Sequence, residues 1–158
     1  MKSQLIFSLL LTASSSAWAA TTRPPAGLPN ADDIAEAAST VSALLGVIDE
    51  LVSKTDGNDG NLENDRLARE ILLRMSADTE SIVDELDVLD KLVAGKKYPE
   101  ATKKQKTICS GLNKLKSDNS NARLGAGLPD EGNISEGDPL FDDIDSDVKD
   151  TRKVLKCK

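Results

Sequence analysis

The chain has 158 residues, a length that suits one ordinary domain, and a net charge of −7 at neutral pH. Only 3% of its residues are aromatic, and none is histidine. This composition disfavours a β-sandwich, removes the imidazole groups used as bases and zinc ligands, and makes nucleic acid a poor partner.

Residues 1–19 have the pattern of a secretory signal peptide. Lys2 supplies the positive start, an apolar run extends from Leu5 to Ala13, and Ala17-Trp18-Ala19 resembles a cleavage site. The apolar run is too short to span a bilayer, and no later segment is long and apolar enough to do so. We therefore expect cleavage after Ala19 and a secreted, extracellular protein without a transmembrane segment. In a bacterium, the periplasm or the cell surface would be the alternative locations.

Residues 20–29 contain three prolines and are expected to form an extended lead-in. The rest of the chain, residues 30–158, is expected to be a single helical domain. Its first helix should span about residues 30–54, because Asn30 can cap a helix and apolar residues then recur at intervals of three and four. Gly46 lies inside this helix and suggests a close approach of another helix.

Glycine, asparagine and aspartate are concentrated at residues 55–61, which should form a turn. The turn resembles a calcium loop, but Arg66 stands where that loop needs a glutamate. The second helix should span about residues 62–94. Its apolar stripe is the clearest in the chain and is broken by one polar residue, threonine. The stripe consists of Ala68, Leu72, Met75, Thr79, Ile82, Leu86, Leu89 and Val93.

The two remaining helices are predicted at about residues 99–116 and 139–155. Residues 117–138 between them are rich in Ser, Asn, Gly and acidic side chains, so we expect a flexible loop. This loop contains Asn133-Ile134-Ser135, a possible glycosylation site at Asn133 if the source is eukaryotic. The stripe of the last helix should consist of Leu140, Ile144, Val148, Thr151 and Leu155.

The chain contains two cysteines, Cys109 and Cys157. In an oxidising compartment, a lone pair is most simply one disulfide. Together, these patterns predict an all-α protein, a disulfide-stapled four-helix bundle built from helical hairpins. Four helices in one chain can bury each other's stripes, so we expect a monomer.

Lysine is concentrated between Lys96 and Lys116, where seven lysines face a single acidic residue. One interpretation is that this basic helix packs beside acidic neighbours in the same bundle. The other is a patch that docks an acidic polymer or partner. The residues of the possible partner-binding patch are Lys96, Lys97, Lys103, Lys104 and Lys106.

The sequence offers no recognisable catalytic constellation, metal-binding motif or cofactor-binding motif, so we expect a protein that is not an enzyme and has no cofactor. The leading hypothesis is a secreted helical protein that binds a partner protein or an extracellular surface, of the type associated with cell walls or hydrophobic surfaces. A second is a secreted effector or toxin-like protein that acts on a host or competitor. A third is a carrier that holds a small apolar ligand between its helices.

Overall fold

The computed structural model describes residues 23–55, 63–126, 134 and 137–158. Its helices are α1 (Ala31–Lys54), α2 (Glu63–Ala94), α3 (Tyr98–Gly125) and α4 (Pro139–Val154), and no strand occurs among the described residues. The predicted all-α class is therefore confirmed for this part of the chain. The predicted signal peptide and most of the turn at 55–61 lie outside the described residues.

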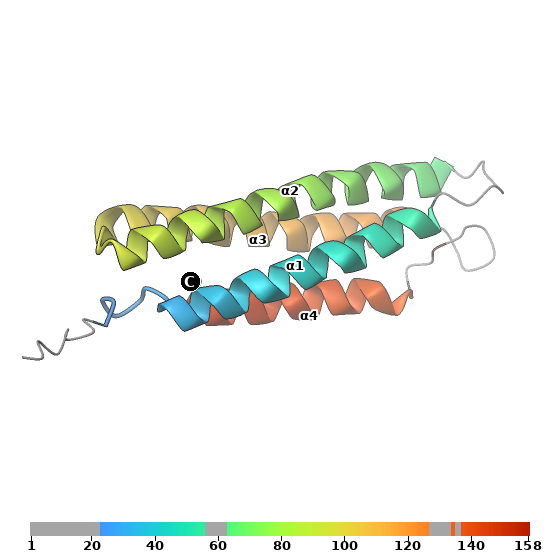
Figure 1. Cartoon of the computed structure of the whole chain (residues 1–158). Helices are drawn as coiled ribbons and strands as arrows, with labels where there is room; N and C mark the ends of the chain where they lie inside the picture. Colours follow the sequence, from blue (N-terminus) through green and yellow to red (C-terminus); the bar gives the residue numbers. More distant parts are fainter. Residues whose placement is uncertain (1–22, 56–62, 127–133, 135–136) are drawn as a thin grey trace, which may run out of the picture.

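The helices pack side by side along a common axis (Figure 1). Helix α2 contacts α1 and α3, and α4 contacts the same two helices. Successive helices run in alternating directions, so the segment before α1 and the residues after α4 lie at the same end of the molecule (Figure 1). This arrangement brings the two ends of the described chain together beside the start of α3.

All four helices contribute buried residues to the core, and α2 contributes its predicted stripe. All eight positions predicted for that stripe are buried. Thr79 is buried completely, and its hydroxyl donates a hydrogen bond to the carbonyl oxygen of Met75 at 2.7 Å. The polar group is therefore satisfied inside its own helix, and the methyl group of the threonine is left to pack with the apolar neighbours.

Helix α1 begins with a reciprocal cap. The side chain of Asn30 accepts a hydrogen bond from the backbone N–H of Asp33 at 2.8 Å. The carboxylate of Asp33 accepts one from the backbone N–H of Asn30 at 2.9 Å. This capping box satisfies two backbone donors at the helix start, which explains why the lead-in ends where the sequence predicts.

The expected close approach at Gly46 was wrong. Gly46 is exposed, and a Cβ atom added there would have nothing within 4 Å. The close approach is instead at Gly111 of α3, where an added Cβ would lie 3.2 Å from two side-chain carbons of Ile82 in α2. A glycine inside a helix pattern therefore marks a contact in α3 but not in α1.

Helix α3 ends at Gly125 and not near residue 116, so the predicted loop at 117–138 was wrong for its first part. Polar residues that suggested a loop are instead buried and paired. Arg74 of α2 donates to Asp118 at 2.9 Å, and the Asn119 amide donates to the carbonyl oxygen of Phe141 at 2.9 Å. These contacts pair the Asp118 carboxylate and the Asn119 amide nitrogen, whereas the Asn119 Oδ1 atom is buried without a hydrogen-bond partner. Ala122 continues the buried face beyond them.

Helix α4 starts at Pro139, after Asp138 accepts a hydrogen bond from the backbone N–H of Leu140 at 3.1 Å. Phe141 is completely buried, whereas Leu140 is only half-buried. The predicted stripe therefore omitted Phe141, whereas its first position, Leu140, is partly buried and packs against the core. The other four positions of that stripe are buried as predicted.

Candidate functional site

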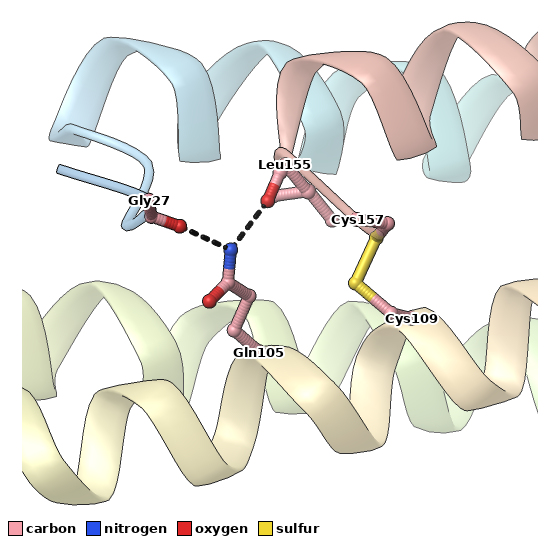
Figure 2. The surroundings of a disulfide bond; sticks show 5 residues. All are labelled: Gly27, Gln105, Cys109, Leu155 and Cys157. Atoms are coloured by element: carbon pink, nitrogen blue, oxygen red, sulfur yellow. Dashed lines mark hydrogen bonds between the residues drawn. A yellow bond between two sulfur atoms is a disulfide. The ribbon is translucent and has the colours of Figure 1, made fainter.

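The disulfide joins the middle of α3 to the residues after α4. Cys109 and Cys157 form this bond with their Cα atoms 5.6 Å apart (Figure 2). Both cysteines are half-buried. The bond fixes residues 155–158, hereafter the tail, against the first half of α3, as the two cysteines in the sequence suggested.

Gln105 holds the tail and the lead-in together. Its side-chain amide nitrogen donates to the carbonyl oxygen of Gly27 at 2.8 Å and to that of Leu155 at 2.7 Å (Figure 2). Gly27 has a φ of 100°, a conformation that side chains other than glycine rarely adopt. One amide on α3 therefore satisfies carbonyl groups from both ends of the described chain.

Lys156 makes a second connection between the tail and the lead-in. At the end of α4, the N–H of Cys157 donates to the carbonyl oxygen of Arg152, and Lys156 has a φ of 56°. This left-handed helix end directs the Lys156 ammonium group towards α1. The group donates to the carbonyl oxygen of Leu28 and to the carboxylate of Asp33, each at 2.9 Å.

The same contacts determine the protonation of Asp33. The backbone N–H of Asn30 and then the ammonium group of Lys156 lower the pKa of Asp33 below its ordinary value, against the opposing effect of burial. The ionised form of this carboxylate is therefore favoured by the folded structure. Asp33 thus caps α1 and pairs with the tail at the same time.

A groove of about 700 Å³ lies beside these connections. We call it the terminal groove, because the lead-in, the tail and the first half of α3 form its walls. Apolar groups come from Pro25, Leu28, Tyr98 and Pro99; polar groups from Thr102, Gln105, Ser110 and Asn113; and ammonium groups from Lys106, Lys156 and Lys158. The remaining lining residues are Ala26, Gly27 and the two cysteines. No aspartate or glutamate is among the lining residues.

The structure divides the predicted lysine patch. Lys104 pairs with Glu85 of α2 at 3.4 Å, as expected for a basic helix beside an acidic one. Lys114, which lies on the same helix outside the patch, pairs in the same way with Asp78 at 2.6 Å. The other four members, Lys96, Lys97, Lys103 and Lys106, are exposed. Of the whole patch, only Lys106 lines the terminal groove.

Sequence reasoning missed most of the groove. The predicted patch did not include Lys156 or Lys158, and Gln105 was not among the predicted site residues. Their roles depend on how the tail folds back on α3, and no local sequence pattern indicates that path. Asn133, the possible glycosylation site, lies outside the described residues.

The groups in the groove are hydroxyls, amides and ammonium groups beside apolar walls. Such a surface can bind by hydrogen bonds, by attraction of negative charge and by burial of apolar area. Within the described part of the chain, no cluster of three or more His, Cys, Asp or Glu side chains is arranged to hold a metal ion. In the same part, every helix is too short or too polar to cross a bilayer.

Comparisons with known proteins do not assign a class to this site. The chain matches no protein-family model, no curated protein and no solved structure.

Proposed function

We propose that this chain is a secreted, non-enzymatic four-helix bundle, built from helical hairpins, that binds a partner protein or an extracellular surface through the terminal groove. The observation that carries the proposal is the groove itself. Apolar walls, hydrogen-bonding side chains and three lysines line one continuous hollow, and of the three lysines only Lys156 forms an ion pair with another described residue. This combination provides both area to bury and groups that select an orientation.

The rigidity of the groove also supports binding. The disulfide, the Gln105 amide and the Lys156 ammonium group fix three different chain segments at this end of the molecule. A partner would therefore meet walls that are already in position, and less conformational entropy would be lost on binding. The side chains that line the groove include no carboxylate or imidazole to serve as a general base near neutral pH, which favours binding over bond-making chemistry.

A second candidate function, the carrier of a small apolar ligand, is favoured by the size of the groove. Its volume of about 700 Å³ is typical of small-molecule sites. A carrier purified from its native surroundings should retain its ligand. Native mass spectrometry of that material would detect the added mass, and its absence would count against the carrier.

Blocking the groove tests the binding function. Ser110 is exposed and lines the groove, whereas Thr107 is exposed on the same helix outside it. We expect Ser110→Trp to fill the groove and to abolish association with the native extracellular material. The matched control, Thr107→Trp, should associate as the unmodified chain does. Equal association of all three proteins would contradict the proposal, and circular dichroism would show whether each variant is folded.

Secretion has a separate test. Expression of the full chain in its source cells should yield an extracellular protein whose mass corresponds to cleavage after Ala19. Thiol labelling of that protein should find neither cysteine free, because Cys109 and Cys157 form the disulfide. An intracellular product of full mass would contradict the proposed location.

A further inference from the structure

We propose that the terminal groove takes an extended, acidic segment of a partner protein. This inference rests on the proposed binding function and names the chemistry of the partner. The charge of the groove, its length along α3 and the polar groups in its wall match such a segment.

The charge of the groove is opposite to that of the chain as a whole. The sequence contains 27 acidic and 20 basic residues, yet the groove is lined by three lysines and no carboxylate side chain. Lys156 forms an ion pair with Asp33. Lys106 and Lys158 are exposed. Neither of these two has an ion pair with another described residue. A negatively charged partner would supply the missing counter-charge in a partly enclosed site, where electrostatic attraction is stronger than on open surface.

The groove has the length of a short extended peptide. It follows α3 from Tyr98 to Asn113, which corresponds to about 22 Å at the rise of an α-helix. An extended peptide covers that distance with about six or seven residues. The lead-in and the tail form the facing wall, so the groove lies along the helix and a linear segment matches its shape.

The polar wall favours a peptide over an acyl chain with a negatively charged head. Ser110 and Asn113 are exposed and line the groove. A peptide backbone offers donors and acceptors to such groups, whereas an acyl chain would cover them and leave them unpaired. Tyr98 and Pro99 at one end provide apolar surface for a side chain of the segment.

The test uses residues 20–158 with the disulfide formed. The ligand is a heptapeptide with blocked ends that has glutamate at positions 1, 3, 5 and 7 and alanine or leucine between them. We expect ¹H–¹⁵N chemical-shift changes confined to residues 98–113, the lead-in and the tail. A matched peptide with glutamine in place of glutamate should bind at least tenfold more weakly. Binding of the acidic peptide should weaken as salt is raised, because ions screen the attraction.

A pair of charge reversals distinguishes the groove from general attraction to lysine. Lys106→Glu should weaken binding of the acidic peptide at least fivefold. Lys116→Glu changes an exposed lysine of the same helix outside the groove, and its affinity should stay within twofold of the unmodified chain. Equal weakening by the two substitutions, or equal affinity for the glutamine peptide, would overturn the inference.

Oleate provides the third arm of the experiment. If oleate shifts the groove residues and the acidic peptide does not, the occupant is an amphiphile and the peptide inference is wrong. If Ser110→Trp abolishes association with native material but the peptide fails to bind, the binding function stands and the inference about its partner fails. If Ser110→Trp has no effect on association, the binding function itself fails.

Discussion

Removal of the disulfide is the change whose effect on the free energy of unfolding follows most directly from the structure. Cys109 and Cys157 are 48 residues apart, so the bond closes a long loop in the unfolded chain. The chain-entropy relation gives about 4 kcal/mol for a loop of this length. A typical domain is stable by only about 5–15 kcal/mol, so Cys109→Ser/Cys157→Ser should lose a large part of its free energy of unfolding.

Urea unfolding followed by far-ultraviolet circular dichroism measures that loss. The oxidised protein and the double variant should have similar helix content at zero denaturant, and the midpoint of the variant should fall. Thermal unfolding should show a decrease in Tm on the order of 15 °C for a domain of this size. The oxidised protein treated with a reductant is the control, because it should unfold like the double variant.

The loss of stability should be largest in the lead-in and the tail, which lie next to the disulfide. Without the bond, the tail is held by the burial of Leu155, the hydrogen bond from Gln105 to Leu155 and the ion pair between Lys156 and Asp33. Amide exchange in the lead-in and the tail should therefore increase more than exchange in the centre of α2. A decrease of less than 1 kcal/mol in the free energy of unfolding, or uniform exchange in both regions, would refute the reasoning about this bond.

Three further tests, with four substitutions between them, probe other parts of the structure by urea unfolding. Lys96 and Lys156 both have a φ of 56°. Lys96→Gly should raise the free energy of unfolding by about 1 kcal/mol, because glycine removes the strain of the left-handed conformation. The Lys156→Gly protein should be less stable than the Lys96→Gly protein, because it loses the hydrogen bonds of Lys156 to Leu28 and Asp33. Asp33→Asn should lower the free energy of unfolding by about 1 kcal/mol at pH 7. The folded state lowers the pKa of Asp33, so the stabilisation by its carboxylate is complete above the unfolded pKa near 4 and disappears as the pH falls through the folded pKa. Gly46→Ala should stabilise α1 by about 1 kcal/mol, because the added methyl group meets no other atom within 4 Å.

Each of these three has an outcome that would contradict it. Equal effects of the two lysine substitutions would mean that the ammonium group of Lys156 contributes nothing. A stability difference between Asp33→Asn and the unmodified chain that stays constant from pH 7 to pH 2 would show that charge is not the cause. Destabilisation by Gly46→Ala would indicate a helix contact that the structure does not contain.

The periodicity of the sequence predicts the helices where apolar residues mark the buried face. Every position predicted for the stripe of α2 is buried, including Thr79, because a threonine can satisfy its hydroxyl within its own helix. The end of α3 was not predicted, because Asp118 and Asn119 are typical loop residues. Their burial depends on Arg74 and on the carbonyl group of Phe141, which lie far away in sequence.

The candidate site could be predicted only in part. The cysteine pair indicated that the tail returns to α3, and the lysine concentration indicated a basic surface there. The groove itself depends on the left-handed conformation of Lys156 and on the amide of Gln105 reaching two carbonyl groups. A lysine in that conformation and a buried glutamine have no distinctive sequence pattern, so these residues could be found only in the folded chain.

The most direct test of binding in the terminal groove is lysine footprinting of the protein mixed with the extracellular material that is proposed to contain its partner. Acetylation of each lysine is measured with and without that material by mass spectrometry. Binding in the terminal groove predicts protection of Lys106 and Lys158, whereas Lys116 and Lys153, which are exposed outside it, should react equally in both samples. Protection of Lys116 and Lys153 with free reaction of Lys106 and Lys158 would contradict the account.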